Sequence, residues 1–325
     1  MKVLELFAGL GACSKALERL GIEHEIVDAV EIDKYAIASF NAIHGTNFET
    51  QDITTWDKDI EVDLIMHGSP CQDFSVAGKQ AGGDVGSGTR SSLMYETIRI
   101  VGKLRPKYVI WENVKNLLSE KHRHNFDAYL ETMKALGYTN YYQVLNAKDY
   151  GIPQNRERVF TISILGEHKP FVFPDTQKLK QRMEDLLQNE ADENYYISEE
   201  KAFYFMTNVL WEGKEATNSE SPHFMGNIYN KDFGTGYAGG VWDKGEISPT
   251  LTTMQGGGRQ PHIIDDKGIR KLTPKECWRL MGFDDTDFEK AAKVNSNSQL
   301  YKQAGNSIVV NVLEEIFKNL FTKED

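Results

Sequence analysis

The chain of 325 residues is long enough to bury a full hydrophobic core, which favours one large domain plus a smaller one. Its composition is ordinary for a globular protein, and no apolar stretch approaches the ~20 residues that span a bilayer, so a membrane protein is excluded. The formal charge of -11 argues mildly against a nucleic-acid partner, but basic residues gather within 254–280, so a locally basic face is compatible with it. Only three cysteines and no visible N-terminal signal favour a reducing cytoplasm over a disulfide-rich secreted class.

The first half of the chain alternates strand and helix signals. Short apolar runs mark the strands, and apolar positions spaced three and four apart mark the helices. Repeated β-α units of this kind predict a mainly parallel sheet with helices on both faces. Strands are expected at residues 3–7, 25–30, 63–66, 108–111, 141–145 and 159–164, and helices from the first glycine turn to about residue 20 and at 34–43, 92–104 and 125–136.

The alternation stops after about residue 170. Residues 222–262 are rich in glycine and aromatic side chains, with turn signals such as Gly256-Gly257-Gly258. This composition predicts a small, loop-rich second domain. Regular helices are expected again at 274–281 and 308–320.

A glycine-rich turn, Phe7-Ala8-Gly9-Leu10-Gly11, follows the first strand. Ligands of open α/β sheets bind beyond the carboxyl ends of the strands, and such a turn lets the backbone approach a ligand. A dinucleotide fingerprint would place a third glycine where Ser14 stands, which weakens a nicotinamide interpretation. A nucleoside ligand without pyrophosphate and a plain tight turn both remain compatible with the pattern.

Acidic residues follow the second strand. Glu31 lies 20 residues after Gly11, a spacing that suits hydrogen bonds from ribose hydroxyls. Asp33 is a rival for this role, or the N-cap of the next helix. Asp52 is a candidate for holding an adenine amine, with a turn residue as the alternative.

A lone cysteine, Cys71, comes directly after Pro70, just past the third strand. The segment from Gln72 to Arg90 is rich in glycine, and such a loop can close over a substrate. An inert, partly buried thiol is the alternative. Cys13 and Cys277 are assigned to packing.

Charged side chains accompany the next two strands. Glu112 follows an aromatic and aliphatic strand, where desolvation would raise the pKa of the carboxyl and let it act as an acid near neutrality; a solvated loop acid is the alternative. Arg156 and Arg158 would share one face if a strand begins there. Guanidinium groups suit base-edge oxygens or phosphates, whereas a surface charge cluster would have no such role.

The chain resembles the DNA cytosine-5 methyltransferases. The motifs run in the order of that family over residues 1–165 and 270–315, with Ala12 where many members carry a second adjacent glycine. The resemblance implies an α/β fold: a Rossmann-like S-adenosylmethionine-dependent methyltransferase sheet at residues 1–170 plus 300–325, and a smaller, loop-rich target-recognition domain at residues 171–299. The matching motifs are LELFAGLG, VEIDKYA, GSPCQDFS, WENVKNL, QNRERVF, KLTPKECWRLMGF and QAGNSIVVNV.

The resemblance also implies roles for individual residues. S-adenosylmethionine would donate the methyl group and leave as S-adenosylhomocysteine, with no metal. Cys71 would be the nucleophile, Glu112 would bind the amine and ring nitrogen of cytosine, and Arg158 would hold the carbonyl oxygen with Arg156 nearby. The cofactor pocket would comprise Phe7, Gly9, Gly11, Glu31 at the ribose, Asp52 at the adenine, and Leu93 and Asn306.

The implied partner is double-stranded DNA with the target base rotated out of the helix, because the C6 face is covered in a stacked duplex. A monomer in the cytoplasm of a bacterial or phage-infected cell is expected. Ser75 or a neighbour would contact the backbone of the flipped nucleotide. The candidate groove readers are Arg259, Gln260, Asn227, Asn230 and Lys231, and Thr250 belongs to a Thr-Leu pair that follows the variable part of the family.

Three other interpretations compete with this one. A tRNA cytosine-5 methyltransferase of the same architecture would share the catalytic motifs. A binding module that kept the fold would not need Cys71, Glu112 and Arg158 together. A Cys-His hydrolase would use His67 as its base and would leave the glycine turn and Glu31 unexplained.

Overall fold

The computed structural model describes residues 1–70, 93–208, 221–229, 238–254 and 259–322. The chain groups into two compact units, both discontinuous in sequence. Unit 1 comprises Met1–Leu145, Glu157–Asp175 and Val312–Asp325, and unit 2 comprises Asn146–Arg156 and Thr176–Asn311.

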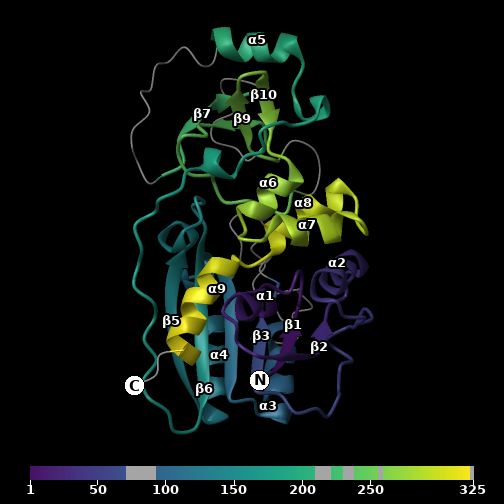
Figure 1. Ribbon diagram of the computed structural model, residues 1–325. Helices are drawn as coiled ribbons and strands as arrows, with labels where there is room; N and C mark the ends of the chain where they lie inside the picture. Colours follow the sequence, from purple (N-terminus) through teal and green to yellow (C-terminus); the bar gives the residue numbers. More distant parts are fainter. Residues whose placement is uncertain (71–92, 209–220, 230–237, 255–258, 323–325) are drawn as a thin grey trace. The chain divides into compact units, whose positions relative to one another are not determined.

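Unit 1 is built on a six-stranded sheet of order β2-β1-β3-β4-β6-β5, with helices around it (Figure 1). The pairs β1–β2, β1–β3 and β3–β4 are parallel, and β6 is antiparallel to β4. The strands are β1 Lys2–Leu6, β2 Glu25–Val30, β3 Leu64–His67, β4 Tyr108–Val114, β5 Tyr138–Asn146 and β6 Glu157–Leu165. The α-helices are α1 Ala12–Arg19, α2 Lys34–His44, α3 Met94–Leu104, α4 Arg123–Ala135 and α9 Val310–Phe317, the last followed by a π-helical turn at Lys318–Thr322.

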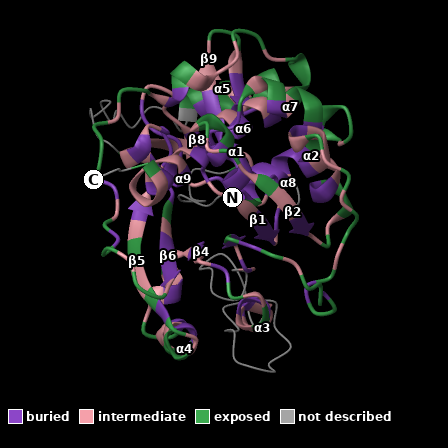
Figure 2. Ribbon diagram, turned by 60° about the horizontal axis from the view of Figure 1, so that its bottom comes forward, coloured by how far each residue is buried: buried purple, intermediate pink, exposed green. Residues whose placement is uncertain are grey.

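Burial explains why the central strands form. In β3 all four residues are buried, and β6 is buried over most of its length, whereas β5 carries exposed positions (Figure 2). A parallel strand covered on both faces reads as a continuous apolar run, which is the pattern of Leu64-Ile65-Met66. The predicted α/β sheet is confirmed, and the strand at 25–30 has the predicted bounds.

The bounds of the other five strands differ from the prediction, and two of these differences concern candidate site residues. β4 continues to Val114, so Glu112 lies within the strand rather than after it. β6 begins at Glu157, so Arg156 precedes the strand and does not alternate with Arg158 on one face, and the expected shared face was wrong. The antiparallel pairing of β4 with β6 explains both where β4 ends and where β6 begins, since the two strands are in register from Tyr108–Ile164 to Val114–Arg158.

Unit 2 contains a small sheet of order β10-β9-β8-β7 and several short helices. Ile228, Val241 and Ile269 of this sheet region pack with the fully buried Phe205. The helices α5, α7 and α8, of 8 to 10 residues each, were not expected from the sequence patterns. The elements are α5 Glu199–Asn208, β7 Phe224–Asn227, β8 Gly240–Trp242, β9 His262–Asp265, β10 Gly268–Lys271, α6 Pro274–Arg279, α7 Asp285–Ala292 and α8 Asn297–Asn306.

The C-terminal residues divide between the units. Residues up to Asn311, including α8, group with unit 2, and only Val312–Asp325 group with unit 1. The reason is packing within unit 2, where the indole of Trp278 in α6 donates to the carbonyl of Leu300 in α8 at 3.0 Å. None of the helices in the described part of the chain combines the length and apolarity needed to cross a membrane.

Candidate functional site

The turn after β1 has left-handed backbone at three positions. Phe7, Gly9 and Gly11 have φ of 54°, 56° and 75°. A Cβ at Gly11 would overlap the imidazole Nε2 of His44 and the ring of Phe40, so only glycine fits there. The turn therefore lies directly against α2, with Phe7 and Gly9 half-buried and Gly11 buried.

Glu31, at the end of β2, is tied to this turn. Its Oε2 accepts from the Gly9 amide at 3.1 Å, and its Oε1 accepts from the Asp33 amide at 2.8 Å. Burial raises the pKa of the Glu31 carboxyl, and the two backbone donors oppose that shift. Asp33, the rival acid, is the N-cap of α2 and accepts from the Tyr35 amide at 2.9 Å. Glu31 is therefore the acid that the fold places beside the glycine turn.

The residue before Asp52 is hydrogen-bonded to the backbone of Glu31. The Gln51 amide donates to the Glu31 carbonyl at 2.9 Å. The carboxylate of Asp52 is exposed, and its Oδ1 accepts from the amide and hydroxyl of Thr54 at 2.9 and 2.8 Å. Asp52 thus shapes its own turn and also reaches solvent next to the predicted cofactor pocket.

Two apolar side chains complete this part of unit 1. Leu93 is half-buried at the N-cap of α3 and packs partly against the main core. Ile32 directly follows Glu31 and is 70% exposed, although it is a large apolar residue. It was not singled out from the sequence, where its only signal is its position next to the acid.

A second residue missed in the sequence is Glu5, which lies behind the glycine turn. The side chain is buried in β1, and its Oε1 accepts from the Ser14 amide at 3.1 Å and from the Ser14 hydroxyl. Burial raises the pKa of this carboxyl to about 7. Its oxygen occupies the N-terminal end of α1, where dinucleotide-binding folds bind a phosphate. The signal in the sequence is an acid inside an otherwise apolar strand.

Glu112 and Arg158 form an ion pair between neighbouring strands. Nε of Arg158 lies 3.0 Å from Oε1 of Glu112, and the two side chains are 17% and 11% exposed. The last β3–β4 register pair is His67–Trp111, so Glu112 extends past the end of β3. Nη1 of Arg158 donates to the Glu157 carbonyl at 2.8 Å, and no described residue contacts its Nη2. The pair therefore combines a fixed carboxylate with guanidinium donors available to a ligand.

His67 cannot serve as a catalytic base in this fold. The imidazole is fully buried and stacks on the Trp111 ring, with centroids 5.6 Å apart and an interplanar angle of 7°. Burial lowers its pKa to about 3, so it is neutral near pH 7 and has no path to a substrate. This removes the Cys-His hydrolase interpretation.

Arg156 lies inside unit 2, away from any surface. It is 3% exposed, and its guanidinium donates to the carbonyls of Leu251, Gly305 and Ser307 at 3.0, 3.0 and 2.9 Å. A cation that binds three backbone carbonyls organises those segments. We therefore assign Arg156 to positioning within unit 2 rather than to chemistry on a base.

The predicted recognition residues of unit 2 differ in exposure. Arg259 is exposed and Gln260 is half-buried, whereas Asn227 is buried and donates to the Ala238 carbonyl at 2.7 Å. The Thr250 hydroxyl donates to the Asn155 carbonyl at 2.5 Å, so it anchors the backbone. Asn306, the last residue of α8, is exposed. Cys71, Ser75, Asn230 and Lys231 lie outside the described residues.

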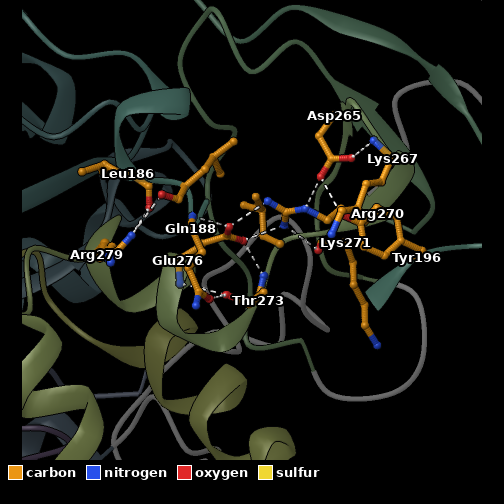
Figure 3. A network of polar contacts seen from close by, with 12 residues as sticks. Leu186, Gln188, Tyr196, Asp265, Lys267, Arg270, Lys271, Thr273, Glu276 and Arg279 are labelled. Carbon is orange, nitrogen blue, oxygen red and sulfur yellow. Dashed lines mark hydrogen bonds and ion pairs between the residues drawn. The ribbon is translucent and has the colours of Figure 1, made fainter. Parts of the chain in front are cut away.

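A saturated polar network also lies in unit 2 (Figure 3). The Arg270 guanidinium binds both oxygens of Glu276 at 2.9 Å and Oδ2 of Asp265 at 2.7 Å. Glu276 also accepts from the amides of Gln188 and Thr273 at 2.9 and 2.7 Å. Every strong donor and acceptor here is used, so the network holds β9, β10 and α6 together.

Cys13 and Cys277 are buried, and burial raises the pKa of both thiols, as expected for inert packing residues. Among the described residues no cluster of histidine, cysteine and carboxylate side chains has the arrangement of a metal site.

A sequence profile described as C-5 cytosine-specific DNA methylase matches residues 1–322 of the chain. The chain is 36% identical to "Type II methyltransferase M2.ScrFI" from Lactococcus lactis subsp. cremoris, with 100% of each covered. It is 34% identical to "Type II methyltransferase M.Bsp6I" from Bacillus sp. (strain RFL6), with 99% of this chain and 98% of that one covered.

Solved structures share the fold. The "Crystal structure of S. pombe Dnmt2 methyltransferase" has a TM-score of 0.72 at 20% identity, with 99% of each chain covered. The Entamoeba histolytica methyltransferase EhMeth has a TM-score of 0.73 at 18% identity, with 100% of this chain and 99% of that one covered.

Proposed function

Because the chain belongs to the C-5 cytosine-specific DNA methylases and is a DNA (cytosine-5-)-methyltransferase, we propose that it methylates C5 of a flipped cytosine through a covalent adduct between Cys71 and C6. The donor would be S-adenosylmethionine, and the substrate a specific sequence in duplex DNA. The observation that carries the proposal is the Glu112–Arg158 pair, which holds a carboxylate and spare guanidinium donors past the end of β3.

The glycine turn fits a nucleoside ligand better than a dinucleotide. The Glu5 carboxyl already fills the N-terminal end of α1, so a pyrophosphate would meet a carboxyl instead of free amides. Glu31 would accept bonds from the ribose hydroxyls, and Asp52 would accept from the adenine amine. Ile32 would pack on the apolar face of the base, with Phe7, Gly9, Gly11 and Leu93 as the further predicted contacts. When bound, S-adenosylmethionine supplies an electrophilic methyl group.

Glu112 and Arg158 would bind the cytosine edge. The carboxyl of Glu112 would accept from the exocyclic amine and hold a proton at ring N3, and Arg158 would donate to the carbonyl oxygen O2. A proton at N3 lowers the electron density at C6, which favours nucleophilic attack there. The bond from Arg158 to Glu112 keeps the carboxyl aligned before the base arrives.

Cys71 would add to C6, because a thiolate is the strongest nucleophile among protein side chains. The new S–C6 bond makes C5 enamine-like, and C5 then takes the methyl group. Loss of the C5 proton to water and cleavage of the S–C6 bond restore the aromatic ring and the free thiol. The loop from Gln72 to Arg90 is the proposed cover for the flipped nucleotide, with Ser75 at its backbone.

Recognition of the DNA sequence is assigned to unit 2. Arg259 and Gln260 are the proposed readers of base edges, since both combine long side chains with hydrogen-bond donors. Thr250 and Asn227 are not proposed as direct readers, because each side chain donates a hydrogen bond to the backbone of unit 2. Residues 300–311 and 146–156 group with the recognition unit rather than with the sheet.

The test is a Cys71→Ser variant incubated with duplex DNA that contains 5-fluorocytosine. Fluorine cannot leave C5 as a proton does, so the wild-type protein should accumulate a covalent complex, and the variant should form none. Cys277→Ala, which removes a buried thiol of α6, is the matched control and should still form the complex. Equal methyl transfer by Cys71→Ser and wild type would overturn the covalent mechanism.

A methyl-transfer assay distinguishes DNA from tRNA as the substrate. Labelled methyl groups should enter duplex DNA and not tRNA, and sequencing of DNA from a methylation-free host that expresses the protein should reveal one short motif. Transfer to tRNA alone would favour the alternative enzyme of the same architecture.

A further inference from the structure

We propose that Ser69 is a positioning residue for the nucleophile, because its hydroxyl is held by the indole of Trp111 two residues before Cys71. This inference rests on the proposed function, since it takes Cys71 as the attacking group. Ser69 is 3% exposed, and its Oγ accepts from Nε1 of Trp111 at 2.9 Å. A buried side-chain hydrogen bond of this kind fixes the backbone that carries it.

A second bond holds the same residue. Nδ2 of Asn113 donates to the Ser69 carbonyl at 3.2 Å and lies 3.5 Å from its hydroxyl. Asn113 is itself fixed, since its Oδ1 accepts from the Val114 amide at 2.8 Å. Ser69 is thus bound at both side chain and backbone by β4.

The indole that holds Ser69 has little freedom. The Trp111 ring stacks on His67 and contacts Tyr129 and Phe126, with centroid distances of 5.6, 4.3 and 5.8 Å. His67 in turn lies 3.2 Å from the Tyr129 hydroxyl through Nε2. Three aromatic neighbours therefore direct the indole N–H toward the segment after β3.

Strand β4 fixes the positions of both the proposed acid, Glu112, and the segment that leads to the proposed nucleophile. Side chains alternate along a strand, so Trp111 and Asn113 lie on one face and Glu112 on the other. The residues on either side of Glu112 hold Ser69, while Glu112 itself binds Arg158. The separation between the proposed acid and the start of the nucleophile segment is therefore set within three consecutive residues.

The chain between Ser69 and Cys71 is short. Two peptide units join their Cα atoms, which limits the separation to about 7 Å. Pro70 fixes its own φ and restricts Ser69 to extended conformations. We expect a displaced Ser69 to shift the start of the segment that carries the nucleophile, and a misplacement of about 1 Å can cost about a hundredfold in rate.

The experiment compares Ser69→Ala, Trp111→Phe and the double variant. The rate of adduct formation on 5-fluorocytosine DNA should fall about tenfold to a hundredfold in Ser69→Ala at saturating DNA and cofactor. The KM values for DNA and cofactor should stay within about twofold, because Ser69 is 3% exposed and is not among the residues proposed to bind either ligand. The double variant should be no slower than Ser69→Ala, because both variants lose the same bond.

Stability is controlled in two ways. The double variant removes donor and acceptor together, so it leaves no buried indole N–H without a partner and should still fold. Tyr138→Phe removes another buried bond of unit 1, from the Tyr138 hydroxyl to the Pro106 carbonyl at 2.7 Å, and should lower the melting temperature without slowing the adduct rate.

The outcomes separate the inference from the proposed function. An unchanged adduct rate in Ser69→Ala, or an equal loss of rate in Tyr138→Phe, would overturn the positioning role of Ser69. A change confined to KM would also overturn it. A wild-type protein that forms no adduct would instead refute the covalent mechanism itself.

Discussion

Each unit contains an arginine–glutamate pair, and the two pairs differ in how many of their hydrogen-bonding groups are used. In unit 2, Nε and both Nη atoms of Arg270 are bonded, and the side chains of Arg270 and Glu276 are 2% and 0% exposed. In unit 1, Nε of Arg158 lies 3.0 Å from Oε1 of Glu112, Nη1 of Arg158 donates to the Glu157 carbonyl, and the side chains of Arg158 and Glu112 are 17% and 11% exposed. The saturated pair holds segments together, whereas the unsaturated pair has donors left for a ligand.

The difference follows from what surrounds each pair. Glu276 also caps α6 and accepts amides from Gln188 and Thr273, so its four bonds compensate the cost of burying the charge. Glu112 lies past the end of β3, where no neighbouring strand covers it on that side. Substitutions in the Glu112–Arg158 pair should therefore lower activity, and substitutions in the Arg270–Glu276 pair should lower stability.

The largest effect should come from Glu112→Gln. Loss of the carboxyl removes the proton carrier at N3, and single-turnover methylation should slow about a thousandfold, which corresponds to about 4 kcal/mol. The melting temperature should change little. Glu157→Gln, which alters an exposed carboxyl bonded to Lys115, is the matched control and should keep full activity. An equal loss of activity in both variants would contradict the assignment.

The corresponding substitution in unit 2, Glu276→Gln, should lower the free energy of unfolding. It leaves Arg270 buried without its bidentate partner, and chemical unfolding should show a loss of about 3 to 5 kcal/mol. Protein that remains folded should transfer methyl groups at close to the wild-type rate. A variant as stable as wild type would show that the network in Figure 3 does not hold unit 2 together.

Glu5 is a third carboxyl to compare with Glu112 and Glu276. Unlike those two, it is contacted by no cation among the described residues. Its folded-state pKa of about 7 lies above the ordinary value, so the folded protein binds a proton that the unfolded chain has lost between about pH 4.5 and 7. The contribution of Glu5 to stability should therefore decrease as pH rises through this window, by about 3 kcal/mol in total. Unfolding at pH 5 and pH 7.5 should show a smaller difference for Glu5→Gln than for wild type. Glu61→Gln, which alters an exposed carboxyl, should keep the wild-type difference.

The smallest effect should come from Arg158→Lys. A lysine ammonium cannot hold Glu112 and donate to the base carbonyl with the fork geometry of a guanidinium, so the single-turnover rate should fall about tenfold. Arg123→Lys, at an exposed i,i+4 pair with Asp127, is the control and should have no effect. A full loss of folding in Arg158→Lys would mean that this pair is structural after all, like the pair in unit 2.

Local patterns predicted the parts of the site that lie on single elements. Glu31 follows a short strand of six residues, and the glycine turn follows a short apolar run. Patterns failed where the partner is distant in sequence. The expected shared face of Arg156 and Arg158 was wrong because β6 begins at Glu157, and Arg156 instead binds carbonyls 95, 149 and 151 residues away. Glu5 was missed because its role depends on Ser14 in the next element.

The sequence by itself determined the order of strands and helices in the sheet of unit 1, the acid and glycine turn at the first two strand ends, and the family to which the chain belongs, because these depend on periodicity and on short motifs. Only the tertiary structure decided which arginine–glutamate pair has donors to spare, which of two neighbouring arginines lies inside unit 2, and what holds Ser69. The physical reason is that hydrogen-bond saturation and burial are set by neighbours far apart in the chain.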